Sequence, residues 1–148
     1  MTTMTLEELA QSGELDLGHS DWVQVDERHI ELFADATGDH QWIHVDPEAA
    51  AKGPFGTTVA HGYLSLSLIP ALLADLLTVS DGTVGINYGI DKVRFTAPVP
   101  SGSRVRLHAV LRSPERRGES VLYRLGVEIE LEGGGKPALV GDVLYLAA

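Results

Sequence analysis

The chain has 148 residues, a length that fits one domain with a sizeable hydrophobic core. Hydrophobic residues at 44% and charged residues at 22% exclude general disorder, and the absence of cysteine excludes disulfides, thiolate metal sites and cysteine nucleophiles. The formal net charge is −10, and no Lys or Arg cluster is present to displace phosphate counterions, which argues against nucleic acid as a partner. We therefore expect one domain spanning residues 1–148.

The N-terminal segment predicts neither a targeting signal nor a membrane anchor. Residues 1–18 carry four acidic side chains and no Lys or Arg, unlike a secretory or transit peptide. The longest uncharged run lies between Lys52 and Asp75, and Gly, Thr, Ser, His and Pro interrupt it. It is therefore typical of a buried helix rather than a membrane span. We expect a soluble, cytoplasmic protein with no membrane partner.

The first 40 residues predict short elements. A short helix begins near Thr5, and the alternation over 21–25 indicates an edge strand. Asp26 has the character of an N-cap for a helix through about Thr37, which Gly38 then ends by its tolerance of left-handed geometry. One face of this helix carries the apolar residues Ile30, Phe33 and Ala34.

The middle of the chain predicts two further helices. Asp-Pro-Glu at 46–48 is a second start signal, for a short helix that ends near Gly53. Residues 58–79 are long, apolar and rich in Leu and Ala, which predicts the core helix, with a kink at Pro70.

The second half of the chain predicts antiparallel strands. Four runs rich in Val, Leu, Ile and Arg are separated by turn residues; they cover 83–97, 104–113, 119–131 and 137–147. Long strands joined by short turns and one buried helix indicate an α+β fold in which the sheet wraps round the helix. Such a sheet leaves edges that commonly pair across a dimer.

Asp39 and His44 are the candidate acid/base pair. Five positions apart, they would point about 140° from each other on a helix, but a loop between Gly38 and Asp46 can turn both into one cleft. A carboxylate beside an imidazole is suited to handling one water molecule. The alternative is structural, with Asp39 capping a helix and His44 bonding a carbonyl, and spacing leaves both open.

Three neighbours of this pair have simpler interpretations. His40 is expected to be an exposed loop residue. Trp42 and Ile43 are expected to anchor the loop on the core.

Gly62 is the candidate backbone donor. The first N–H groups of a helix lack partners within it, and a glycine lets a ligand carbonyl approach closely. Such a donor would stabilise negative charge that develops on that oxygen. Alternatively, Gly62 marks a place where the core helix passes close to a strand, and the sequence does not decide between these.

Three segments carry a family resemblance. They are Asp39-His-Gln-Trp-Ile-His44-Val-Asp-Pro, Pro54-Phe-Gly-Thr-Thr-Val-Ala-His-Gly62 and Asn87-Tyr-Gly-Ile-Asp-Lys-Val-Arg94-Phe-Thr-Ala-Pro-Val-Pro. Together they resemble the MaoC-like, (R)-specific enoyl-CoA hydratase family, in particular its branch similar to nodulation protein N. The similarity covers roughly residues 20–112, and the last strands only by pattern.

The resemblance implies a hot-dog fold, in which an antiparallel sheet wraps one long central helix, usually in a dimer. It also implies that Asp39 and His44 hold the catalytic water and that the Gly62 N–H binds the thioester carbonyl. The family motif D-x-N-x-x-H has asparagine where this chain has Gln41, and proline at the next position where it has Trp42. Gln41 keeps the amide but moves it by one methylene, which puts its help in orienting the pair in doubt.

The implied activity is the reversible addition of water to a trans-2-enoyl-CoA, giving a (3R)-3-hydroxyacyl-CoA. No cofactor is required, and no metal is expected because no third ligand is apparent beside His40 and His44. Two alternatives remain: a hot-dog acyl-CoA thioesterase, and a non-catalytic acyl-CoA-binding or accessory subunit. We expect an acyl-CoA thioester substrate and a homodimer.

Substrate binding has its own candidate residues. Gln41, Tyr63 and Arg94 are the candidates, with Tyr63, Leu66 and Leu73 considered for the acyl tunnel. The CoA phosphates require local cations in a protein of net charge −10. The candidates are Lys92 with Arg94, or Arg112 with Arg116 and Arg117.

Overall fold

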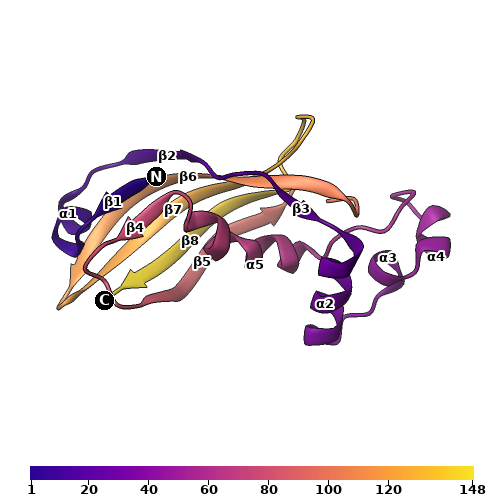
Figure 1. Ribbon diagram of the computed structural model, residues 1–148, viewed down its shortest axis with the longest axis horizontal. Helices are drawn as coiled ribbons and strands as arrows, with labels where there is room; N and C mark the ends of the chain where they lie inside the picture. Colours follow the sequence, from indigo (N-terminus) through magenta and orange to yellow (C-terminus); the bar gives the residue numbers. More distant parts are fainter.

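A computed structural model describes residues 1–148 and shows a strongly curved sheet with one helix lying in its hollow (Figure 1). The helices are α1 (Leu6–Gln11), α2 (Glu27–Thr37), α3 (Trp42–Val45), α4 (Pro47–Ala51) and α5 (Gly62–Leu73). The strands are β1 (Thr2–Met4), β2 (Leu15–His19), β3 (Val23–Val25), β4 (Leu77–Val79), β5 (Gly85–Phe95), β6 (Ser103–Arg117), β7 (Ser120–Leu131) and β8 (Leu139–Ala147).

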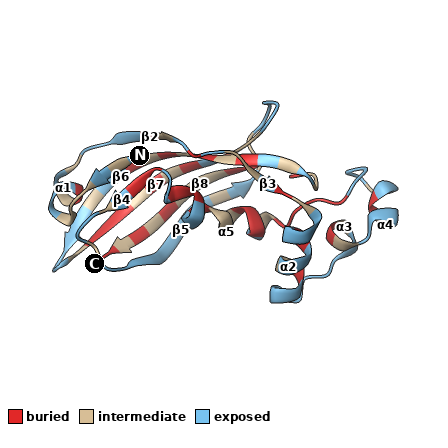
Figure 2. Ribbon diagram, viewed as in Figure 1, coloured by how far each residue is buried: buried red, intermediate tan, exposed pale blue.

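The main sheet has six strands and is antiparallel throughout. Its order is β2-β6-β7-β8-β5, and β3 also pairs with β6, beyond the end of β2. Burial alternates along β6, where Val105, Leu107, Ala109 and Leu111 point into the core. Buried residues therefore follow the strands of the sheet on the side that faces α5 (Figure 2).

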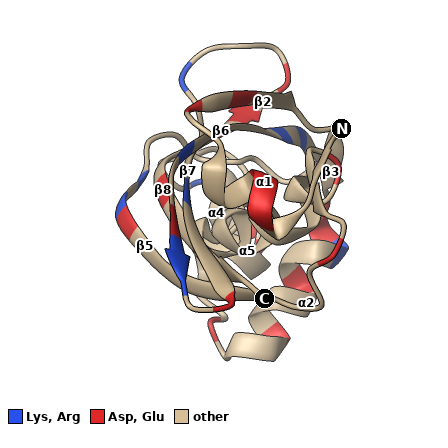
Figure 3. Ribbon diagram, turned by 90° about the vertical axis from the view of Figure 1, so that its left-hand side faces the viewer, with Lys and Arg blue, Asp and Glu red and all other residues tan.

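Helix α5 fills the hollow of the sheet. It carries no charged residue, and Leu64, Ile69 and Leu72 are buried in the core (Figure 3). The sheet-round-helix arrangement is thus the predicted one. None of the helices reaches the length and hydrophobicity that crossing a membrane requires.

The core helix is shorter than the predicted span of 58–79. Before it, residues 58–61 are extended, because the amides of Val59 and Ala60 donate to the carbonyls of Ile43 and Val99 at 3.0 and 2.8 Å. After it, β4 pairs in parallel with β1. A uniformly apolar run does not distinguish a buried helix from buried extended chain, which explains the difference.

The predicted helix caps are confirmed. Asp26 accepts a hydrogen bond from the His29 amide, and Gly38 ends α2 with a φ of 79°. The four long strands also lie within a few residues of the predicted runs. The short elements β1, β2 and α3 were not predicted, since each is too short to show a period of its own.

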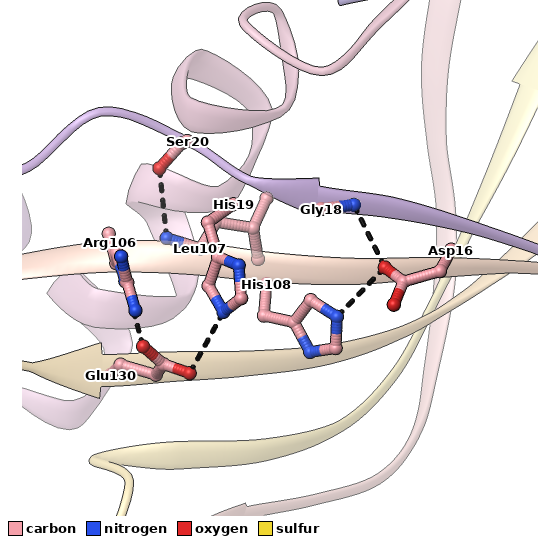
Figure 4. A network of polar contacts seen from close by, with 8 residues as sticks. All are labelled: Asp16, Gly18, His19, Ser20, Arg106, Leu107, His108 and Glu130. Carbon is pink, nitrogen blue, oxygen red and sulfur yellow. Dashed lines mark hydrogen bonds and ion pairs between the residues drawn. The ribbon is translucent and has the colours of Figure 1, made fainter.

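The outer face of the sheet carries a ladder of paired charges away from α5. His19 and His108 stack at 4.6 Å; His19 bonds Glu130, and His108 bonds Asp16 (Figure 4). The Gly18 amide and His108 lower the pKa of Asp16. Partial burial raises the pKa of Glu130, but the hydrogen bonds from Arg106 and His19 outweigh it, so that this pKa is lowered. The charged side chains of this ladder are therefore paired with one another.

Strand β5 forms one edge of the main sheet and is exposed over nearly its whole length. Large apolar side chains stand out from it, including Ile86, Tyr88 and Ile90, each about half exposed. An exposed, apolar edge strand is a template for pairing with another chain.

Candidate active site

The loop after α2 carries the candidate carboxylate. Gly38 turns the chain out of α2, and the following Asp39 is exposed. Its backbone amide lies 3.3 Å from Thr37 Oγ1, and its Oδ1 accepts from the Gln41 amide at 3.3 Å. Asp39 therefore caps no long helix, and its second carboxylate oxygen makes no hydrogen bond within the protein.

His40 braces this loop rather than standing free. Its Nε2 lies 2.9 Å from Oδ1 of Asp35 on α2, and this hydrogen bond raises the pKa of His40. The side chain is exposed, as predicted, and its bond to Asp35 ties the loop to α2.

His44 reaches the site from the short helix α3 and is buried, with 8% of its surface exposed. Its Nδ1 lies 2.6 Å from the carbonyl oxygen of Val59. A carbonyl can only accept, so Nδ1 is the protonated nitrogen of the neutral ring and Nε2 keeps its lone pair. Nε2 makes no hydrogen bond within the protein, which leaves it available as a base.

Asp39 and His44 are brought together as expected, although His44 lies on the short helix α3 and not on the loop that the sequence predicts. One ligand atom of each, together with one of His61, lies within 4.8 Å of the others. His61 is a site residue that the sequence reasoning did not assign. The signal available was its place directly before Gly62 in the second motif.

The same three residues bear on the predicted absence of a metal. A third potential ligand, His61, does lie close, contrary to the sequence-based reasoning. However, the rings of His44 and His61 are stacked at 3.8 Å with 24° between their planes. Lone pairs of stacked imidazoles run side by side, so that one cation could not lie in the plane of both rings as imidazole ligation requires. The residues present therefore fit a metal poorly.

Gly62 begins α5, and its N–H makes no hydrogen bond within the protein. An added Cβ would lie 2.8 Å from Cγ of Phe95, too close for any side chain. Both interpretations of Gly62 therefore hold in the structure: the helix passes close to β5 there, and the N–H is free. Because it is the first residue of a helix, this N–H lies at the positive end of the helix dipole.

A cavity of about 420 Å³ joins these groups. His44 and Gly62 both line it, together with the mainly apolar residues Ile43, Phe55, Val59, Ala60, Ser65, Phe95, Thr96, Ala97, Pro98, Val99 and Ala138. A mostly apolar cavity with a few polar groups at one end is typical of a small-molecule site. His44 and Gly62 thus border the same cavity.

The predicted tunnel residues lie elsewhere. Tyr63 is 67% exposed and contacts Phe95 edge-on, at 5.6 Å between ring centroids. Leu66 lines a second cavity, of about 290 Å³, between α5 and the strands β5 and β8, while Leu73 is part of the core. Tyr63 therefore stands at the rim beside Phe95, and neither leucine borders the cavity of His44.

Gln41 and Arg94 are both exposed near the site. Gln41 precedes α3, and its side chain makes no capping hydrogen bond. Arg94 lies on β5 next to Phe95, and its guanidinium bonds only the neighbouring carbonyl of Val93.

The other candidate cations are already engaged. Arg112, Arg116 and Arg117 are all paired with acidic side chains, whereas Lys92 and Arg94 form no ion pair. The free cations therefore lie on the strand that borders the cavity.

The arrangement combines a carboxylate, a basic imidazole nitrogen and a free helix N–H around an apolar cavity. Asp39 and His44 can hold and deprotonate a water, while the N–H can accept developing charge on an oxygen. This set of groups is suited to acid/base chemistry on a water molecule.

Comparison with known proteins agrees with this geometry. Residues 10–132 match the family described as MaoC like domain. The chain is 49% identical over 149 residues to 3-hydroxyacyl-thioester dehydratase Z of Mycobacterium tuberculosis (strain CDC 1551 / Oshkosh), covering 99% of both chains. It is 50% identical over 132 residues to nodulation protein N of Rhizobium leguminosarum bv. viciae, covering 86% of this chain and 81% of that one.

Solved structures show the same fold. The R-hydratase PhaJ1 from Pseudomonas aeruginosa superposes with a TM-score of 0.71 at 26% identity, covering 97% of this chain and 84% of that one. The resemblance seen in the sequence motifs and the hot-dog fold it implied are therefore confirmed. The chain belongs to the MaoC-like dehydratase family.

Proposed function

We propose that this protein is an (R)-specific enoyl-CoA hydratase, which adds water reversibly to a trans-2-enoyl-CoA and forms a (3R)-3-hydroxyacyl-CoA. Its dehydratase and hydratase relatives support a hydro-lyase of this class. The observation that carries the proposal is the His44 hydrogen bond to Val59, which leaves Nε2 of a buried imidazole free beside the Asp39 carboxylate.

In this mechanism Asp39 and His44 hold one water between them. The water oxygen forms a bond to C3 of the substrate while its proton is taken up by the pair and then delivered to C2. The electron pair of the double bond moves toward the thioester, and negative charge develops on the carbonyl oxygen. The Gly62 N–H donates a hydrogen bond to that oxygen and stabilises the charge.

The apolar cavity beside His44 would take the acyl chain. Its walls come from α3, α5, the end of β5 and the segments near residues 55–60, 96–99 and 138, and they are formed largely by aliphatic and aromatic side chains. Tyr63 stands beside Phe95, which lines the cavity, and Arg94 is the next residue of β5 and has no acidic partner, so these two would bind the pantetheine and phosphates of CoA. Gln41, next to Asp39, would help to orient the pair.

We also propose that the protein works in the cytoplasm as a homodimer, each chain being one hot-dog domain over residues 1–148. The exposed apolar edge of β5 supports pairing with a second chain. That edge runs into Phe95 at the rim of the cavity, so dimerisation would also enclose the site.

One assay tests the proposed reaction against its alternatives. Purified protein is incubated with crotonyl-CoA while the enoyl absorbance and the release of free thiol are both followed. Loss of absorbance without thiol, with a product of (3R) configuration, is the expected result. Thiol release would instead indicate a thioesterase, and no change in either signal would contradict catalysis on this class of substrate. Activity retained after treatment with a chelator would agree with acid/base chemistry that needs no metal.

A further inference from the structure

His61 is an enclosed polar side chain of the site. Only 3% of its surface is exposed, and it lies at the N-cap of α5, directly before Gly62. Its ring is held between two others: Phe33 at 4.9 Å with 54° between planes, and His44 at 3.8 Å with 24°.

The two nitrogens of His61 are in different situations. Nε2 lies 2.9 Å from the backbone carbonyl oxygen of Asp39, which can only accept, so Nε2 carries the proton of the neutral ring. Nδ1 is therefore a lone-pair acceptor, and it is the one buried side-chain nitrogen or oxygen in the protein without a partner. An unpaired buried polar atom is costly, and a phenyl or aliphatic side chain would avoid that cost.

The geometry points to a role that offsets this cost: we propose that His61 is a positioning residue, which sets the relative placement of Asp39 and His44. The proposal rests on the function proposed above. The Nε2–H bond ties the backbone of Asp39 to the start of α5, and the stacked ring fixes the plane of His44. A single side chain thus links the backbone of Asp39, the imidazole of His44 and the helix that presents the Gly62 N–H.

Apart from the bond from His61, Asp39 is weakly held. It is exposed, and its side chain is held by one weak contact, 3.3 Å from the Gln41 amide. His44, by contrast, is locked through Nδ1 to Val59. Without the bond from His61, the carboxylate could move relative to a fixed imidazole, and a displacement of about 1 Å costs on the order of a hundredfold in rate.

Two substitutions separate the hydrogen bond from the packing. His61→Phe keeps an aromatic ring between Phe33 and His44 but removes the donor. His61→Gln removes the ring but keeps an amide N–H at about the reach of Nε2. We expect His61→Phe to lower kcat for crotonyl-CoA hydration about a hundredfold with KM changed by less than about threefold. His61→Gln is expected to regain at least about tenfold of that loss.

The matched control is His108→Phe. His108 also stacks on a histidine, His19, but on the outer face of the sheet, so its replacement is expected to leave kcat and KM unchanged (Figure 4). Circular dichroism and the Tm establish that each variant folds. Should His61→Phe not fold, His61→Asn replaces it, since its amide is one methylene too short to reach Asp39.

The proposal is overturned if His61→Phe keeps kcat within about twofold of the wild type, or if His61→Gln loses as much as His61→Phe or His61→Asn. Asp39→Asn, measured in parallel, separates this failure from failure of the proposed function. An active Asp39→Asn variant removes the basis of both. A dead Asp39→Asn variant beside a fully active His61→Phe variant rejects the positioning role alone.

Discussion

Nδ1 of His44 lies 2.6 Å from the carbonyl oxygen of Val59, fifteen residues further along the chain. A second hydrogen bond joins the same two segments, in which the Val59 amide donates to the carbonyl of Ile43 at 3.0 Å. His44 thus bonds a carbonyl, as the structural interpretation expects, and this bond is compatible with the proposed catalytic role. One nitrogen holds the ring in place, and that bond leaves the other nitrogen free.

The hydrogen bond to Val59 predicts the tautomer of His44. We expect the neutral ring to carry its proton on Nδ1, and ¹⁵N NMR of the imidazole nitrogens can assign it. His44→Ala identifies the resonances by their disappearance. A ring protonated on Nε2 would place the lone pair toward Val59 and contradict the proposed base.

Replacement of the dyad tests the chemistry. Asp39→Asn and His44→Ala are each expected to lower kcat by about a hundredfold or more, because each removes a group that handles the catalytic water. The double variant should be little worse than either single variant, since groups acting as a unit are not additive. Gln41→Ala is expected to cost less than either.

Controls for the dyad variants are binding and folding. Acyl-CoA binding should survive in both, since neither side chain is placed to hold the pantetheine or the phosphates. Asp39→Asn preserves the shape of the side chain and so tests charge rather than packing. A folded Asp39→Asn variant that hydrates crotonyl-CoA at near the wild-type rate would contradict the catalytic role of Asp39.

Gly62→Ala should affect both stability and activity, because the new methyl group would lie 2.8 Å from the Phe95 ring and at the edge of the cavity. Combining it with Phe95→Leu relieves the crowding and should restore much of the Tm. If access to the N–H matters, kcat stays at least about tenfold low in the double variant. Recovery of kcat together with the Tm would show that Gly62 serves packing only.

The exposed apolar edge of β5 leads us to expect a dimer. Light scattering should give a mass near twice the 15.9 kDa of one chain. Ile90→Lys places a charge in the middle of the exposed apolar edge and should shift the mass toward that of the monomer. The control is Leu32→Lys on α2, a position that is also about half exposed, and it should leave the mass unchanged. A wild-type protein that is monomeric at micromolar concentration would count against the proposed dimer.

Two stacked tyrosines predict loss of stability at alkaline pH. Burial raises the pKa of Tyr123 and of Tyr145 to about 12, and the rings pair across β7 and β8 at 5.8 Å. In the unfolded chain these phenols ionise near pH 10. The folded state therefore binds more protons between about pH 10 and 12, and the free energy of unfolding falls as pH rises through that window.

Urea unfolding at pH 8 and at pH 11 measures this effect. Replacing both phenols in Tyr123→Phe/Tyr145→Phe removes the groups that titrate and should flatten the decline. Tyr88→Phe, at an exposed position, is the control that should keep the wild-type pH dependence. An equal decline in wild type and double variant would contradict the assignment.

Local sequence patterns were enough to predict the caps and the long strands, and the loop that carries Asp39, but not the short helix α3 that carries His44. Asp26 and Gly38 act through their immediate neighbours, and strand alternation repeats within a few residues, so these features need no knowledge of the rest of the chain. The family motifs added the pairing of Asp39, His44 and Gly62, which the structure places around one cavity or at its edge.

Other features arise from contacts between distant segments. The start of α5 at Gly62 rather than near residue 58 depends on hydrogen bonds from Val59 and Ala60 to Ile43 and Val99. Likewise, His61 enters the site because it meets Asp39, 22 residues before it, and the cavity wall combines α3 with residues near 97 and 138. The sequence pattern of apolar residues indicates that a segment is buried, but it does not indicate which distant segment it packs against.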